Sequence, residues 1–401
     1  MPDLFETTRI KTLELKNRIV RSATHEGMSD ENGFPQPALI KLYERIARGG
    51  AGLIISGYAY VSRDGNSNLF RMQAIDRDAH IPAYREMVDR VHAAGARIAM
   101  QIAHCGRQTT REAAGTQPLA PSAIRDQSLL TTPRPMTDRD IQRIIEAFAQ
   151  AARRVKAAGF DAVQLHAAHG YLLNQFLCPR TNRRTDLWGG SIQNRMRIIG
   201  EIYQRCRALV GADFPILIKI SAYDTKKKGL RLEEGVIMAR MMSEMGFDGI
   251  EVSCGIFEDN FSTIRGDAPL DVFADDWEVY RKKSALYRWI LKHFGRQIIR
   301  PLPFSEAYNR EAARAIKAAV SVPVFLVGGL SVPETLARVI EQGDADYLSL
   351  SRALIADPAF PDKIAAGSTE PSRCVHCNLC MAYSTRRPLR CYHGKRLNLA
   401  A

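Results

Sequence analysis

Long apolar runs are missing from this 401-residue sequence. No stretch approaches the roughly 20 uninterrupted apolar residues that a membrane span needs. The first residues, MPDLFETTRIKTLELKNR, lack the apolar core of a signal peptide. A G-x-G-x-x-G motif after the first expected strand is also missing, which argues against an open, doubly wound sheet. We therefore expect a cytoplasmic protein that has no membrane partner.

Dense runs of one charge are scarce as well, although the formal net charge is +13. Lys and Arg are spread along the chain, and the densest basic stretches are YDTKKKGLR and the C-terminal tail. No nucleic-acid motif or interleaved aromatic platform accompanies them, so we expect no nucleic-acid partner. Apolar residues make up 46% and charged residues 25%, which is typical of a globular protein. Anionic cofactors or substrates would explain part of the positive charge.

Short apolar runs alternate with amphipathic helical segments through most of the chain. Runs such as AGLII, PILIKI and PVFLV are typical of parallel strands buried on both faces. Eight strands are expected, at 18–24, 51–58, 97–104, 161–167, 215–221, 248–254, 323–328 and 345–350. Eight strand–helix units with right-handed crossovers predict an α/β fold of the (β/α)8 TIM-barrel type.

This pattern divides the chain into three parts. The barrel is expected to occupy residues 1–368, and a cysteine-rich tail residues 369–401. The interval after the sixth strand, about 256–306, is too long for an ordinary loop. We expect it to fold as an insertion that caps the barrel and shapes the substrate pocket as a lid.

Polar residues at the carboxyl ends of barrel strands are the candidates for catalysis, because the site of a TIM barrel is built there. The fourth strand ends in LHAAHGYLLNQF, which places His166, His169 and Tyr171 within six residues of one another. Two imidazole N–H groups can hold a substrate oxygen while a phenol delivers a proton nearby. These three residues are therefore predicted to be catalytic.

Other strand ends carry residues suited to an anionic heterocyclic cofactor. Gln101 has an amide that can pair with a carbonyl and an N–H of a heterocycle. Lys219 lies inside the strand ILIKIS, where a barrel interior tolerates its charge only beside an anion. The last two strands end where barrels commonly bind phosphate. The residues at those two ends are Gly328, Gly329, Ser351 and Arg352.

The motifs, taken in order, resemble the FMN-dependent old yellow enzyme family. They are KNRIVRSATHEG, QIAHCGR, HAAHGYLLNQFLCPRTNRRTDLWGGSIQNR, VGGL and GDADYLSLSRALIADP. The segment RTNRRTDLWGGSIQNRMR is the most specific of them, and the resemblance covers most of residues 1–368.

The resemblance implies an FMN across the barrel mouth. Gln101 would meet the pyrimidine edge, and Lys219, where the family usually has arginine, would face N1 and O2. Gly328, Gly329, Ser351 and Arg352 would hold the phosphate. Residues that would lie against the flavin ring are Ser22, Ala23, Thr24 and His25 near N5, with Gly57 or its neighbour at the ring.

The family also implies a chemistry. In such enzymes hydride passes from reduced flavin to the β-carbon of an activated alkene. The histidine pair would hold the carbonyl or nitro oxygen, and the tyrosine would protonate the α-carbon. These roles would fall to His166, His169 and Tyr171 in this sequence.

Eight cysteines are distributed unevenly. Four in the body, at 105, 178, 206 and 254, are expected to be reduced and buried. Four in the tail follow the spacing C-x2-C-x2-C-x10-C, and they are Cys374, Cys377, Cys380 and Cys391. Zinc sites usually show two separated pairs of ligands, whereas three close thiols and a distant fourth suit an iron–sulfur cube. The spacing resembles that of the larger family members trimethylamine dehydrogenase and 2,4-dienoyl-CoA reductase. A [4Fe-4S] cluster is favoured, with zinc and an empty or oxidised cluster left open.

Three functional hypotheses follow. The first is an ene-reductase that reduces an α,β-unsaturated carbonyl or related small molecule, with NAD(P)H reducing the flavin directly because only ten residues follow Cys391. The second is a flavin and iron–sulfur dehydrogenase that oxidises an amine or saturated substrate and passes electrons to a carrier protein. The third is a non-enzymatic, zinc-tailed binding protein. A homo-oligomer is left open.

Overall fold

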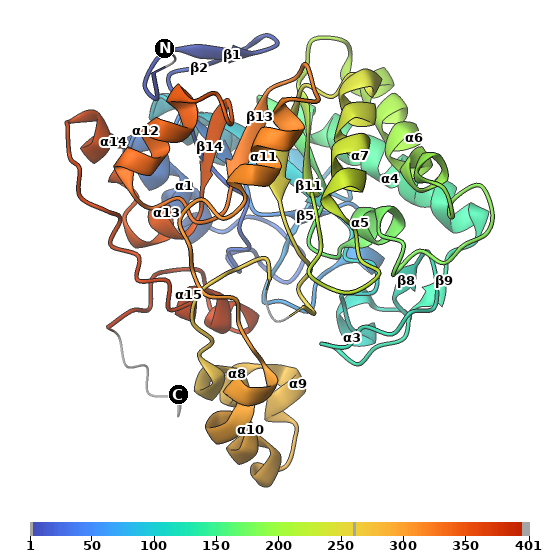
Figure 1. The fold of residues 1–401 in the computed structure, drawn as a ribbon. Helices are drawn as coiled ribbons and strands as arrows, with labels where there is room; N and C mark the ends of the chain where they lie inside the picture. The colour runs from blue at the N-terminus through green and yellow to red at the C-terminus, as the bar shows by residue number, and fades with distance from the viewer. Residues whose placement is uncertain (1–2, 260–261, 395–401) are drawn as a thin grey trace.

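Eight parallel strands form a closed barrel in the computed structural model, which describes residues 3–259 and 262–394 (Figure 1). The barrel closes because β10 pairs with both β11 and β7. In barrel order the strands are β3 (Ile19–Arg21), β4 (Leu53–Ile55), β7 (Arg97–Ala103), β10 (Ala162–Ala167), β11 (Ile216–Ser221), β12 (Gly249–Ser253), β13 (Val324–Val327) and β14 (Tyr347–Leu350). Each lies within an expected strand, so the predicted (β/α)8 barrel is confirmed.

Helices cover the outside of the barrel between successive strands (Figure 1). The principal ones are α1 (Pro37–Arg48), α2 (His80–Ala93), α4 (Asp138–Ala157), α6 (Ile192–Val210), α7 (Leu232–Met245), α11 (Arg310–Lys317), α12 (Pro333–Glu341) and α13 (Arg352–Ala356). Thr137 and Asp140 form the capping box that begins α4, as the sequence predicts. Apolar faces of these helices pack on the strands and form one large core.

The amino-terminal end of the barrel is closed by a hairpin of β1 (Thr8–Ile10) and β2 (Leu13–Leu15). Ile10, Leu13 and Leu15 pack against residues from the first halves of the strands, including Leu53 and Phe325. Since this end is filled with apolar side chains, a functional site can open only at the carboxyl ends of the strands.

The long interval after β12 holds three helices that project from the barrel on the side opposite the hairpin (Figure 1). They are α8 (Leu270–Asp276), α9 (Glu278–Arg281) and α10 (Ala285–Ile298). Their apolar side chains pack against the tail, where α15 (Leu379–Ala382) begins shortly after Cys377. The indole of Trp277 donates a hydrogen bond to the carbonyl of Ala382 at 2.8 Å. The insertion and the tail therefore share one small core.

Parts of the expected insertion and tail, residues 260–261 and 395–401, lie outside the described residues. Across the helices that are described, none combines the length and hydrophobicity needed to cross a bilayer.

Candidate active site

A cavity opens at the carboxyl ends of the strands and offers about 200 Å³ to the centres of water-sized molecules. It is lined by thirteen of the fourteen residues that the sequence assigns to catalysis or flavin binding. They are Ser22, Ala23, Thr24, His25, Gln101, His166, His169, Tyr171, Lys219, Gly328, Gly329, Ser351 and Arg352. Loops that are distant in the sequence therefore meet at one place, as the barrel predicts.

Gly57, the fourteenth residue, does not line the cavity. Its backbone N–H donates to the carboxylate of Glu26 at 3.0 Å, and a Cβ at this position would lie 1.9 Å from that carboxylate. Its neighbour Tyr58 lines the cavity instead. The same buried carboxylate accepts hydrogen bonds from Arg21 at 2.5 Å and from Tyr43 at 2.6 Å. Glu26 thus links Arg21 and Gly57, which directly precede the cavity-lining residues Ser22 and Tyr58.

The floor of the cavity contains a buried ion pair. Lys219 on β11 lies 3.3 Å from Glu251, its register partner on β12, and both side chains are almost fully buried. The Lys219 ammonium also donates to the Ser22 hydroxyl at 2.8 Å, and that hydroxyl donates to Glu251 at 2.8 Å. Burial lowers the pKa of Lys219, while Glu251 acts in the opposite direction. The anion expected beside Lys219 is thus a carboxylate of the protein.

This ion pair extends to the predicted flavin-pairing amide. Gln164 donates to Glu251 at 2.9 Å and accepts from the amide of Gln101 at 2.7 Å. Because the Nε2 of Gln101 is held in this way, the orientation of its amide is fixed from below. Gln101 can then present its carbonyl oxygen to a ligand in the cavity.

The two histidines are neutral at physiological pH. Burial holds the pKa of His166 well below its usual value and lowers that of His169 to about 3, and the charge of Lys219 acts in the same direction. The backbone N–H of Ala168 donates to Nδ1 of His166 at 3.3 Å, which leaves the ring proton on Nε2. Nε2 of His169 lies 2.7 Å from the Ser253 hydroxyl. Each ring is therefore oriented by a protein contact.

Tyr171 lies beside this pair, with its ring centroid 4.8 Å from that of His166. Its hydroxyl donates to the Tyr58 hydroxyl at 2.9 Å. Burial raises the pKa of both phenols, so each keeps its proton at neutral pH. The centroid of His169 is 5.1 Å from that of His166, which completes a compact group of proton donors.

The other end of the cavity suits a phosphate. Gly328 and Gly329 have φ values of +129° and +70°, and a Cβ on Gly329 would lie 2.3 Å from the carbonyl oxygen of Ser305. Glycine is required there because the backbone both turns and lies close to a neighbour. The hydroxyl of Ser349 is buried without a hydrogen-bond partner and lines the same cavity. An anionic oxygen would satisfy this donor.

The four tail cysteines line a second, smaller cavity together. Burial raises the pKa of Cys374, and that of Cys380 to about 12. No group of three or more His, Cys, Asp or Glu side chains in the described residues is arranged to hold a single metal ion. Arg352 and Cys380 line both cavities, so one wall separates the two sites.

Glu251, Gln164, Ser253 and Ser349 are site residues that the sequence analysis did not identify, whereas Tyr58 is the neighbour of Gly57 that it left open. Glu251 had a signal, since it is the one charged residue in the buried strand GIEVS. The described body cysteines, by contrast, are all buried and unpaired, as predicted.

Comparison with known proteins identifies the family. The profile of the NADH:flavin oxidoreductase / NADH oxidase family matches residues 3–292. The NADH oxidase of Thermoanaerobacter brockii is 37% identical over 380 residues, which are 94% of this chain and 53% of that protein. The multifunctional alkene reductase/demethylase OYE of Caballeronia cordobensis is 32% identical over 384 residues, 94% of this chain and 51% of that protein. The structure of a 2-naphthoyl-CoA reductase complex superposes with a TM-score of 0.82 at 25% identity, over 96% of this chain and 55% of that one.

The chain belongs to the NADH:flavin oxidoreductase / NADH oxidase family. It spans about half the length of the two curated relatives described above. The resemblance to old yellow enzymes is confirmed, and the family is one of flavin-dependent oxidoreductases. This membership does not favour the hypothesis of a non-enzymatic binding protein.

The ion pair in the cavity floor generates a stability prediction. Glu251→Gln should lower the free energy of unfolding by about 3 kcal/mol, because it leaves the buried Lys219 without its anion. The double variant Lys219→Met/Glu251→Gln should recover much of that loss in thermal unfolding. Additive losses in the double variant would contradict the coupling.

The buried imidazoles generate a pH prediction. An unfolded histidine has a pKa of about 6.5, whereas that of His169 in the fold is about 3. Between these values the unfolded chain binds more protons, so the free energy of unfolding should fall as the pH falls from 6.5 towards 3. His166→Asn/His169→Asn should reduce this slope, and the exposed His293→Asn should not. An unchanged slope in the double variant would contradict the assignment.

Proposed function

We propose that the protein is an ene-reductase that reduces the activated C=C bond of an α,β-unsaturated carbonyl or related compound. One observation carries the proposal. Two neutral imidazoles and a protonated phenol, His166, His169 and Tyr171, lie side by side in the cavity of a flavin-dependent family member. A set of donors without a charged base suits the stabilisation of developing negative charge and the delivery of one proton.

The residues present fit an FMN. Gln101 and Lys219 would meet the pyrimidine side of the flavin from the cavity floor, and Ser22 to His25 would lie along its ring. Gly328, Gly329, Ser351 and Arg352, together with the unpartnered hydroxyl of Ser349, would hold the phosphate. When bound, the flavin supplies the hydride that it has taken from NAD(P)H.

The protein side chains would act on the substrate oxygen and on the proton. Nε2–H of His166 would donate to the carbonyl oxygen, where negative charge grows during the reaction, so this contact strengthens in the transition state. His169, held by Ser253, would provide the second polar contact. Tyr171 would deliver its proton to the α-carbon. The contact with the Tyr58 hydroxyl at 2.9 Å holds the Tyr171 oxygen in place, and the proton that Tyr171 now donates to Tyr58 would turn to the substrate when it binds.

Tyr171→Phe tests the proton donor. It should slow alkene reduction by about 100-fold, because a positioned proton donor contributes at least that much. Reduction of the enzyme by nicotinamide, which needs no phenol, should keep its rate. Rapid-mixing measurement of the two half-reactions separates them, with Tyr203→Phe on α6, away from the cavity, as the control. Equal slowing of both half-reactions would rule out this role.

The second candidate is a dehydrogenase that oxidises an amine or saturated substrate and exports electrons through the tail. The wall that Arg352 and Cys380 share between the two cavities favours it. Enone-dependent consumption of NAD(P)H by the protein alone supports the ene-reductase. Activity that requires an added electron carrier supports the dehydrogenase.

We further propose that the four tail cysteines hold a [4Fe-4S] cluster. They face a common cavity, and a cube binds each thiolate through a different iron. An arrangement that does not suit one ion is therefore compatible with a cluster. Metal ligation would also deprotonate thiols whose pKa burial otherwise raises.

Metal analysis of protein purified without oxygen tests the cluster. About four iron atoms and four sulfides per chain are expected. Cys374→Ser should remove most of the iron, whereas Cys206→Ser, a buried body cysteine on α6, should leave it unchanged. One zinc per chain, or cysteines without metal in the anaerobic protein, would contradict the cluster.

A further inference from the structure

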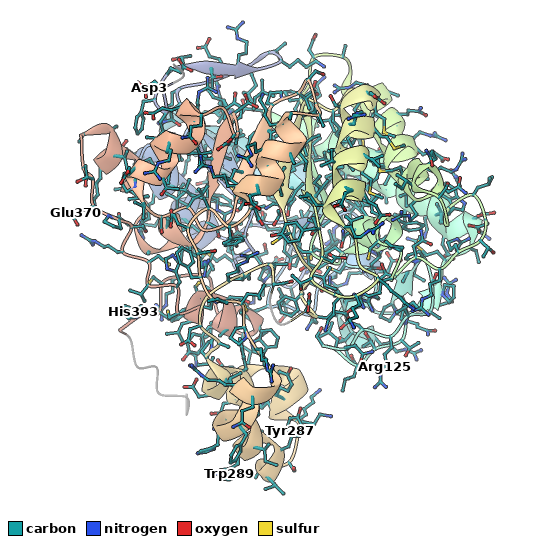
Figure 2. The ribbon with its side chains drawn as sticks, viewed as in Figure 1. Asp3, Arg125, Tyr287, Trp289, Glu370 and His393 are labelled. Atoms are coloured by element: carbon teal, nitrogen blue, oxygen red, sulfur yellow. The ribbon has the colours of Figure 1, made fainter. Side chains whose placement is uncertain are left out.

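Helix α10 lies at the projecting end of the insertion (Figure 1). It exposes an unusual amount of apolar surface. Ten large apolar side chains are exposed among the described residues, and five of them belong to this one helix. They are Leu286, Tyr287, Trp289, Ile290 and Phe294, with exposed fractions from 38% to 67%. Figure 2 shows Tyr287 and Trp289 at the extremity of the molecule, away from the barrel. Exposed apolar surface of this kind marks an interaction site.

The spacing of these residues places them on one face. Leu286, Ile290 and Phe294 follow one another at intervals of four, which is one stripe of an α-helix. Trp289 lies beside the stripe, with its ring 5.7 Å from Phe294 and stacked on His293 at 4.7 Å. The exposed side chains therefore form a continuous aromatic and aliphatic surface, which we call the α10 face.

The opposite side of α10 is fixed to α8. Leu291 is buried, and a Cβ on Gly295 would lie 2.9 Å from Leu270, so the two helices lie close together. Arg288 and Lys292 pair with Asp275 on α8 at 3.6 and 2.8 Å. The helix is thus held on α8 by Leu291, Gly295 and two ion pairs, and the α10 face points outward.

Exposed cations border the α10 face at both ends. Arg281 and Lys283 precede the helix and Arg300 follows it, and all three are exposed. Arg296 in the last turn is also exposed, but it pairs with Asp267 at 2.8 Å. Cations before a helix N-terminus oppose the helix dipole, so Arg281 and Lys283 do not stabilise α10. Two antiparallel copies of the helix would also bring like charges together. The charge pattern therefore favours an anionic partner over a second copy of this chain.

We propose that the α10 face docks the protein on an anionic lipid surface. Trp, Tyr and Phe with flanking Lys and Arg on one short amphipathic helix are the composition of an interfacial helix, which lies on a bilayer and does not cross it. The apolar side chains enter the headgroup region, and the cations contact lipid phosphates. This differs from the expectation, based on the absence of membrane spans, that no membrane takes part.

The insertion also connects the α10 face with the catalytic cavity. Phe257, Ile264 and Phe304 come from the two ends of the inserted segment and line the cavity wall. A docked α10 would therefore hold the lid of the cavity at the lipid surface.

Binding of the purified full chain to vesicles tests the proposal. The protein should sediment with vesicles of equal parts phosphatidylglycerol and phosphatidylcholine, more weakly with phosphatidylcholine alone, and less as the salt concentration rises. Leu286→Ser/Trp289→Ser should lower the partition coefficient by at least about tenfold, because that is the effect expected from the loss of even one large apolar side chain from the bilayer. Lys283→Gln should lower it by about fivefold at low salt.

The matched controls are Leu187→Ser and Ile237→Ser, which remove exposed apolar side chains elsewhere with exposed fractions of 63% and 45%. Both should bind vesicles like the unaltered protein, and NAD(P)H oxidation in solution should be the same in all variants. Failure of the unaltered protein to bind anionic vesicles, or equal binding by all variants, would overturn the proposal. If the protein instead forms concentration-dependent dimers, and only the α10 variants abolish them, the α10 face binds a second copy of this chain and the lipid proposal is wrong.

Discussion

The buried ion pair between Lys219 and Glu251 is the constraint on which the cavity depends. Two charges at the centre of a barrel are stable only when they are paired and their remaining groups are hydrogen-bonded. Ser22 and Gln164 supply those bonds, and Gln164 passes the orientation on to Gln101. The ion pair and its hydrogen bonds thus join four strands, β7, β10, β11 and β12, in the cavity floor. They also keep a positive charge beneath the place proposed for the flavin.

The same charge influences the residues proposed to be catalytic, which lie above it. Lys219 acts with burial to lower the pKa of His166 and His169, so the imidazoles remain neutral donors. Tyr171 keeps its proton for a related reason, because burial disfavours the phenolate. Donors that are neutral and already oriented need little reorganisation when charge develops on a substrate.

Much of this site could be predicted from the sequence, because a barrel brings its strand ends together. His166, Gln101 and Gly329 needed only the strand assignments to be placed at one mouth. Glu251 could not be paired with Lys219 in advance, because that requires the register between β11 and β12. The sequence likewise could not show that Gly57 lies against Glu26 and not in the cavity, because this contact joins segments that are distant in the sequence.

The insertion could be predicted only in part. Its length indicated an inserted segment, but which face of α10 stays exposed depends on how that helix packs on α8.

A crystal structure of the protein with its bound flavin is the most direct test of the central claim. The account predicts the flavin ring between Lys219 and the His166–His169 pair, with its phosphate at Gly328, Gly329 and Arg352. A flavin bound elsewhere, or with its phosphate beside Lys219, would contradict it.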